Sequence, residues 1–200
     1  RPTRLPQVPG VDMAARYVPG HDFGIGGDWY DVFALPTGWL GVVIGDVSGH
    51  GLGSAVVMGR IRSALRAYAL VCDDPAAALT LLDRKVHHFE AGNLTTALYA
   101  MISPDRSAIH VSLAGHLAPV LAAPQRPAVV PRIVVDPPLG IGGKPMDRHT
   151  TVIDFPHADM ASLTDRPATP LEIAIGQTLA GVRHPVAAWR TRAPFRRLVY

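Results

Sequence analysis

The chain has 200 residues, 48% of them hydrophobic and 18% charged, a composition typical of a globular domain with a buried core. Its formal net charge is +3, but residues 183–200 hold five arginines and no acidic residue. Without that +5, the first 182 residues have a net charge of −2, which argues against a nucleic-acid partner. Cys72 is the single cysteine, which excludes an internal disulfide, and no 18 apolar residues follow one another, so we expect a cytoplasmic protein without a membrane partner.

Strand patterns open the chain. Residues 11–18 alternate weakly between apolar and polar side chains, which predicts a strand. Two further strand-like runs, residues 29–35 and 40–44, are separated by the turn signal Pro36-Thr37-Gly38. Together these two runs predict a β-hairpin.

Helical patterns follow the hairpin. The segment 45–53 holds four glycines in nine residues and predicts a tight connection. After it, apolar residues recur at steps of three and four, which predicts an amphipathic helix over residues 52–71. A second helix is predicted over residues 75–91, where the same spacing repeats and Pro75 suits the first turn.

The second half of the chain returns to strand patterns. Residues 96–102 and 108–113 predict another hairpin. Further strands are predicted at residues 120–122, 129–135 and 150–155. A last helix is predicted over residues 170–182, with Thr169 as its N-cap.

Strands in hairpins with two helices inserted indicate an α+β layered domain with antiparallel sheet packed against helices. No repeat or linker-like segment divides the chain. We therefore assign residues 1–182 to one domain and residues 183–200 to a basic, solvated C-terminal tail.

Two aspartates occupy the ends of the first predicted hairpin. Asp28 opens its first strand and Asp46 closes its second, and each follows a glycine. Because the start of one antiparallel strand lies beside the end of the next, both carboxylates should meet at one edge. Two converging carboxylates repel each other unless a cation lies between them, and oxygen ligands suit Mg²⁺ or Mn²⁺. The alternative is that each Gly-Asp pair is ordinary turn chemistry.

Two sequence motifs surround these aspartates, GGDWYDVF and GDVSGHGLGSAVVMGRIRSALRA. They resemble the two leading motifs of the SpoIIE-like branch of the PPM-type metal-dependent serine/threonine protein phosphatases. TTALYAMI, AGHLAPVL and PPLGIG follow in the family's order. The similarity covers roughly residues 8–156 and implies a sandwich of two antiparallel β-sheets flanked by α-helices.

The resemblance also implies a metal centre and a reaction. Asp46 would bridge two Mn²⁺ or Mg²⁺ ions, Asp28 would bind one of them, and the backbone carbonyl of Val47 would add a ligand. Asp28 and Asp46 are therefore the expected catalytic residues. The family hydrolyses phosphoserine or phosphothreonine by direct attack of a water that the ions make more acidic.

Two histidines lie within these motifs. His50 is expected beside the metal edge or at the start of a helix. His116, in the AGHLAPVL motif, fits a structural role in a turn at a strand end.

The C-terminal third departs from the family pattern. A Thr-Asp-Gly motif normally supplies a further metal ligand, and its counterpart here is Thr164-Asp165 followed by Arg166. Asp165 is thus the candidate for that ligand. The family ends on a strand with an Asp-Asp pair, whereas no aspartate follows Asp165 in this chain.

Two hypotheses of function follow. The first is a phosphoserine/phosphothreonine phosphatase that acts on a small anti-sigma-factor antagonist and so takes part in sigma-factor regulation. The second is a catalytically impaired pseudophosphatase that binds phosphoproteins as a regulatory module. By the resemblance, a homodimer could form through regions that precede this chain.

Overall fold

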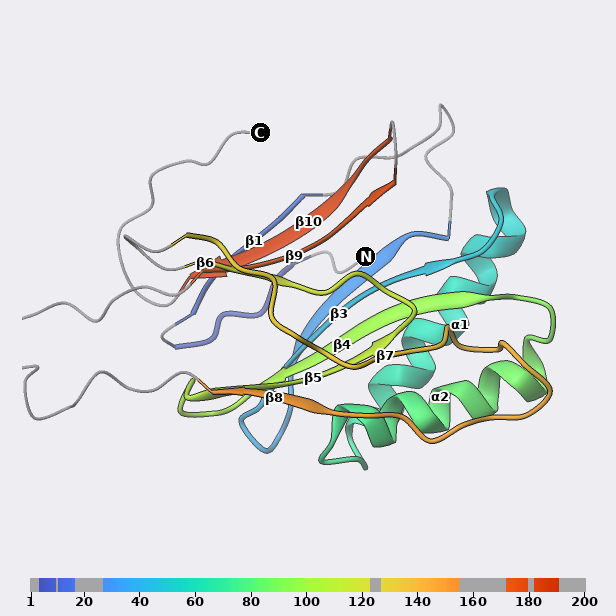
Figure 1. The fold of residues 1–200 in the computed structure, drawn as a ribbon, viewed down its shortest axis with the longest axis horizontal. Coiled ribbons are helices and arrows are strands. Elements are labelled where there is room, and N and C mark those ends of the chain that lie inside the picture. The colour runs from blue at the N-terminus through green and yellow to red at the C-terminus, as the bar shows by residue number, and fades with distance from the viewer. Residues whose placement is uncertain are drawn as a thin grey trace, which may run out of the picture.

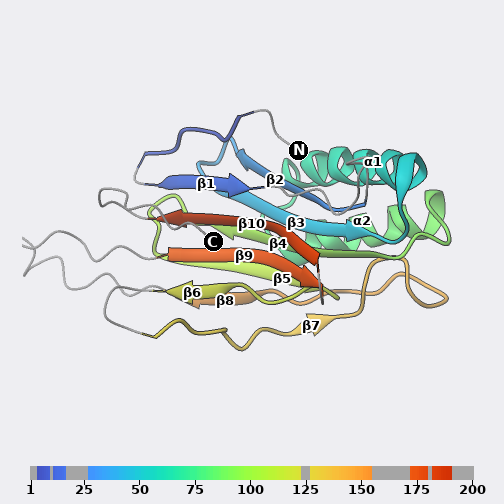
Figure 2. The same cartoon turned by 90° about the horizontal axis from the view of Figure 1, so that it is seen from above.

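The computed structural model describes residues 4–9, 11–16, 27–122, 127–154, 172–179 and 182–190. Its strands form two sheets that lie face to face (Figures 1 and 2). The larger sheet has the order β2-β3-β4-β5-β7, with β8 also paired to β5, and consists of β2 (Trp29–Ala34), β3 (Leu40–Val47), β4 (Thr95–Ile102), β5 (Ala108–Ala114), β7 (Val135–Asp136) and β8 (Thr151–Asp154). The smaller sheet has the order β1-β10-β9-β6 and consists of β1 (Asp12–Arg16), β10 (Val182–Arg190), β9 (Glu172–Leu179) and β6 (Val120–Ala122).

Two helices, α1 (Gly51–Ala69) and α2 (Pro75–Phe89), cover the face of the larger sheet that is turned away from the smaller sheet (Figure 1). Helix α2 begins where the side chain of Asp74 accepts a hydrogen bond from the backbone N–H of Ala77 (2.9 Å). Helix α1 buries Val57, Ile61 and Leu65, which are spaced by four residues and therefore share one face. The expected α+β sandwich with flanking helices is confirmed.

Alternation along the strands divides the core into two clusters. On β3, Val42 and Ile44 face the smaller sheet, whereas Val43 and Val47 face the helices. The cluster beneath the helices also takes in the buried Trp29 of β2. Both faces of the central strands are thus covered, which explains why residues 40–44 read as an almost continuous apolar run.

The pairing of the described strands is not purely antiparallel. Strand β5 pairs with β7 in parallel through Leu113↔Val135 and Ala114↔Asp136, while β8 pairs with the earlier part of β5 in the antiparallel sense. The strand predicted over residues 129–135 is wrong in extent, because only a bridge from Val129 to Leu121 and the start of β7 have strand pairing. Pro131 lies between them and cannot donate a ladder hydrogen bond.

The helix predicted over residues 170–182 is wrong. Strands β9 and β10 occupy this region and pair with each other, while β10 also pairs with β1 and β9 with β6. Ile173 and Ile175 alternate with smaller residues, and Gly176 disfavours a helix, so pairing with neighbouring strands determines the local structure. The solvated tail predicted over residues 183–200 is wrong in extent, because residues 183–190 lie in β10, between β1 and β9.

Among the residues described, neither α1 nor α2 has the length and apolar character needed to cross a bilayer.

Candidate metal centre

The two predicted ligand aspartates lie at one end of the larger sheet. Strand β2 pairs with β3 in the register Trp29↔Gly45, so Asp28, one residue before Trp29, lies across from Asp46. Tyr30 and Ile44, two residues along each strand, face the smaller sheet. Asp28 and Asp46 therefore share that face, and both are partly buried. We call this group, Asp28, Asp46 and the Val47 carbonyl, the carboxylate edge.

Gly27 brings the third predicted ligand into the same place. The Val47 N–H donates to the Gly27 carbonyl (3.1 Å), which extends the ladder past Asp28. A Cβ atom built on Gly27 would lie 1.9 Å from the Val47 carbonyl oxygen and 3.0 Å from Asp46 Oδ1. The Val47 oxygen and one Asp46 oxygen thus border a space that only glycine leaves open, and oxygen donors of this kind suit a hard divalent cation.

The segment after the carboxylate edge leads directly into α1. Ser48, Gly49 and His50 are exposed, and His50 is the N-cap residue, although its side chain makes no capping hydrogen bond. The expectation that His50 lies at a helix start is confirmed. No acidic residue occupies the first turn of α1, so the positive end of the helix dipole is not neutralised locally. This end of the helix favours an anion.

A contact between the partly buried Thr96 and the buried His116 lies next to Asp46 in the larger sheet. Thr96 of β4 is the register partner of Asp46, and its Oγ1 lies 2.9 Å from His116 Nδ1. His116 is only 4% exposed, and burial lowers the pKa of its imidazole to about 4. The ring is therefore neutral at physiological pH. Sequence reasoning assigned His116 to a turn and missed its contact with Thr96.

Buried Asp83 of α2 anchors the PPLGIG segment near this end of the sheet. Asp83 accepts hydrogen bonds from the backbone N–H groups of Gly140 (2.9 Å) and Met146 (3.1 Å), and Arg148 Nη2 lies 3.2 Å from its Oδ1. Leu139 exchanges two backbone hydrogen bonds with Thr95, the first residue of β4. Sequence reasoning missed Asp83, although a carboxylate within the apolar stripe of a helix was a usable signal.

A second buried carboxylate, Asp31, fixes α1 to β2. Arg66 donates two hydrogen bonds to it, from Nε to Oδ2 (2.6 Å) and from Nη2 to Oδ1 (2.8 Å). Arg62 Nε lies 3.6 Å from the same Oδ2. The hydrogen bond to Asp31 raises the pKa of Arg66, which therefore stays charged. Asp31 thus has a structural role.

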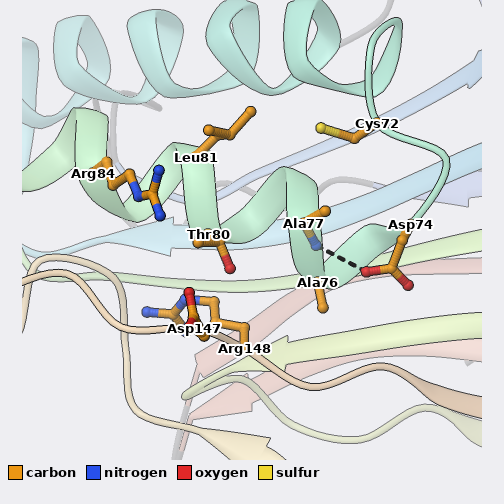
Figure 3. Close-up of a pocket in the computed structure, with 9 residues that line it drawn as sticks. All are labelled: Cys72, Asp74, Ala76, Ala77, Thr80, Leu81, Arg84, Asp147 and Arg148. Carbon is orange, nitrogen blue, oxygen red and sulfur yellow. Dashed lines mark hydrogen bonds between the residues drawn. The ribbon is translucent and has the colours of Figure 1, made fainter.

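A pocket of about 450 Å³ lies along α2 and is separate from the carboxylate edge (Figure 3). Two of its charged side chains have structural partners: Asp74 accepts from Ala77 and Thr150, and Arg148 donates to the Pro137 carbonyl. Cys72 lines the pocket, and burial raises the pKa of its thiol, which leaves it a poor nucleophile. None of Asp28, Asp46 and Val47 contributes to this pocket.

Within the described ranges, no group of three or more His, Cys, Asp or Glu side chains comes together. The carboxylate edge has two carboxylates and a carbonyl, and Asp165, the further predicted ligand, lies outside the described residues. The donors present fit a hard divalent cation in type. Their role as ligands stays a prediction.

Comparisons with known proteins connect this arrangement to a family. The family of Stage II sporulation protein E (SpoIIE) matches residues 36–165, well over half of the chain. Protein IcfG of Synechocystis sp. (strain ATCC 27184 / PCC 6803 / Kazusa) is 38% identical over 68 residues, a match that covers 34% of this chain and 10% of IcfG. The chain therefore matches only a small part of that relative.

Solved structures share the fold. The RsbU and RsbW domains of Rv1364c from Mycobacterium tuberculosis align with a TM-score of 0.72 at 22% identity, over 95% of this chain and 63% of that one. RsbX in complex with magnesium aligns with a TM-score of 0.65 at 13% identity, over 94% of this chain and 97% of that one. At these identities the likeness establishes the sandwich fold alone.

Proposed function

Because the chain belongs to the SpoIIE family of PPM-type protein phosphatases, we propose that it is a metal-dependent phosphoserine/phosphothreonine phosphatase with its active site at the carboxylate edge. One observation carries the proposal: Asp28 and Asp46 face each other across β2 and β3, beside the Val47 carbonyl and the start of α1. Two carboxylates in a partly buried site favour a bound divalent cation over mutual repulsion.

The cofactor in this proposal is Mn²⁺ or Mg²⁺, and the family resemblance implies two ions. Asp28, Asp46 and the Val47 carbonyl would hold them, with Asp165 as a further candidate ligand. When bound, such ions make a water molecule more acidic and neutralise charge on phosphoryl oxygens.

The chain's own residues would position the substrate. The start of α1 offers backbone N–H groups and the positive end of the helix dipole to a phosphoryl group. Gly49 and Gly51 have positive φ angles of 98° and 80°, and a Cβ on either would meet nothing within 4 Å. This open, exposed segment leaves room for a phosphorylated side chain presented by another protein.

The proposed substrate is a small anti-sigma-factor antagonist in its phosphorylated form, within bacterial sigma-factor regulation. The RsbU and RsbW domains joined in Rv1364c support a signalling setting of this kind. The proposed location is the cytoplasm, and homodimerisation through regions outside this chain remains part of the proposal.

Hydrolysis of p-nitrophenyl phosphate across a Mn²⁺ titration tests the proposed chemistry. The parent chain should be inactive in EDTA and regain activity as Mn²⁺ is added, and Asp46→Ala should abolish that activity. Activity that ignores both Mn²⁺ and Asp46 would contradict the proposed site.

A second candidate function is a catalytically impaired pseudophosphatase that binds phosphoproteins. The observation in its favour is that Arg166 follows Thr164-Asp165 where the family has glycine, and that no aspartate comes later. Arginine would bring a cation to a metal edge. Under this alternative, folded parent and Asp46→Ala would both fail to hydrolyse phosphate esters and would bind a phosphoprotein equally well.

A further inference from the structure

We propose that Thr96 and His116 form a positioning pair for the proposed metal site, orienting water molecules beside Asp46. This inference rests on the proposed function, because it concerns the same carboxylate edge. It assigns Thr96 and His116 a role that neither the motifs nor the predicted ligand set gives them.

The register of the larger sheet places Thr96 beside Asp46. Asp46 pairs with Thr96, and both lie on the face that is turned toward the smaller sheet, two residues from Ile44 and Leu98. Side chains directly opposite each other on one face of an antiparallel pair have Cβ atoms about 4.5–5.5 Å apart. The Thr96 hydroxyl is thus close enough to share a water molecule with Asp46.

A left-handed turn at Gly115 brings His116 to Thr96. Gly115 has φ +63° and donates its N–H to the Asp136 carbonyl (2.7 Å), while a Cβ at this position would lie 2.4 Å from Pro138 Cγ. Only glycine tolerates both the positive φ and the close contact. This turn directs the His116 ring back to Thr96, where Nδ1 and Oγ1 are 2.9 Å apart. The hydroxyl is therefore held in one orientation.

The second ring nitrogen of His116, Nε2, also supports the inference. His116 Nε2 is buried and has no hydrogen-bond partner among the residues that the structure describes. Leaving a buried polar group unsatisfied is unfavourable, so such groups nearly always bind protein or ordered water. Because Nδ1 is engaged by Thr96, Nε2 is the nitrogen available to a water molecule. Groups that hydrogen-bond to the ligands of a metal ion commonly orient those ligands.

Thr96→Val and Thr96→Ser test the pair as matched variants. Valine keeps the shape of threonine and removes the hydroxyl, whereas serine keeps the hydroxyl. We expect Thr96→Val to weaken Mn²⁺ binding, measured by calorimetry, by about 10- to 100-fold, and Thr96→Ser to stay within about threefold of the parent. The thermal unfolding midpoints of the two variants in EDTA should agree, which separates positioning from folding.

A double-variant comparison tests whether the two residues act as a unit. His116→Leu alone should weaken Mn²⁺ binding, and Thr96→Val combined with His116→Leu should weaken it no further than the larger single effect. Equal Mn²⁺ affinity in Thr96→Val and Thr96→Ser would overturn the inference, and so would effects of the two single variants that simply add.

The outcomes also separate this inference from the proposed function. If the parent binds Mn²⁺ through Asp46 but hydrolyses no phosphate ester, the enzyme proposal fails and the Thr96 affinities still decide the inference. If hydrolysis depends on Mn²⁺ while Thr96→Val binds it like the parent, the inference fails and the function stands. A folded parent that binds no Mn²⁺ overturns both.

Discussion

Asp31 on β2 and Arg66 on α1 form a bidentate ion pair that ties the first helix to the edge strand of the larger sheet. The two nitrogen–oxygen distances are 2.6 and 2.8 Å, and the Asp31 side chain is only 1% exposed. Asp31 lies in the GGDWYDVF motif that also holds Asp28, and Arg66 lies in the second motif. The pair therefore fixes the position of α1 relative to the strand that leads into the carboxylate edge.

Replacing Arg66 should destabilise the protein because a buried carboxylate would lose its hydrogen-bonded partner. We expect Arg66→Met to lower the free energy of unfolding by about 3 kcal/mol, since methionine keeps the packing length and removes the charge. Arg62→Met is the matched control, and its longer contact of 3.6 Å predicts a loss below about 1 kcal/mol. Urea unfolding of both variants measures the difference, and equal losses would contradict the assignment.

Asp83 should be important for the order of the PPLGIG segment. Asp83→Asn removes the charge that faces Arg148 and one of the two acceptor oxygens for the Gly140 and Met146 N–H groups. We expect a loss of about 2–3 kcal/mol in unfolding free energy. The control is Asp147→Asn at an exposed position, which should change stability by less than about 0.5 kcal/mol. Indistinguishable midpoints in chemical denaturation would refute this role.

Gly27 should be required for metal binding. Gly27→Ala would place a methyl group 1.9 Å from the Val47 carbonyl oxygen, so the ends of β2 and β3 must separate. We expect Mn²⁺ affinity to fall at least tenfold in calorimetry. Gly53→Ala is the control, because a Cβ there meets nothing within 4 Å, and its affinity should match the parent. A Gly27→Ala protein with parental affinity would place the metal elsewhere.

Buried His116 predicts a specific dependence of stability on pH. Its pKa is about 4 in the folded protein and about 6.5 when unfolded. Between these values the unfolded chain binds more protons, so the contribution of His116 is complete above pH 6.5 and is lost as the pH falls toward 4. A difference of one pKa unit corresponds to about 1.4 kcal/mol, so the loss of unfolding free energy is roughly 3 kcal/mol.

The pH effect is measured as the difference in unfolding free energy between the parent and His116→Leu. The value for the parent minus the value for His116→Leu should decrease by roughly 3 kcal/mol from pH 7 to pH 4. The subtraction isolates His116, because the contributions of other titrating groups cancel between the two proteins. A difference that stays constant across this range would show that His116 is not buried as described.

Local signals in the sequence predicted most of the larger sheet and both helices. Turn residues at 36–38 and the helical spacing after Gly53 are short-range features, so the hairpin of β2 and β3 and the helix α1 could be read directly. The same hairpin geometry predicted that Asp28 and Asp46 would meet at one edge. The second sheet was predicted only from the resemblance to the family.

Non-local interactions explain what the sequence reasoning missed. Strands β9 and β10 pair with each other and also with β6 and β1, which lie far away in the chain. The alternation of Ile173 and Ile175 was a local strand signal, but the pairing with β6 and β1 is not contained in any local pattern. The contact of His116 with Thr96 likewise spans 20 residues and depends on the left-handed turn at Gly115. The buried carboxylates of Asp31 and Asp83 meet their arginine partners only after the helices pack on the sheet.

The most direct test of the account is phosphate release from a phosphoserine peptide as Mn²⁺ is added, compared among the parent, Asp46→Asn and Asp154→Asn. Asp154 is exposed at the end of β8 and is the control for loss of a carboxylate. The account predicts a rate that rises with Mn²⁺ in the parent and in Asp154→Asn, and a rate at least about 100-fold lower in Asp46→Asn. Phosphate release that is as fast in Asp46→Asn as in the parent, or no release by the folded parent at any Mn²⁺ concentration, would contradict a working metal centre at the carboxylate edge.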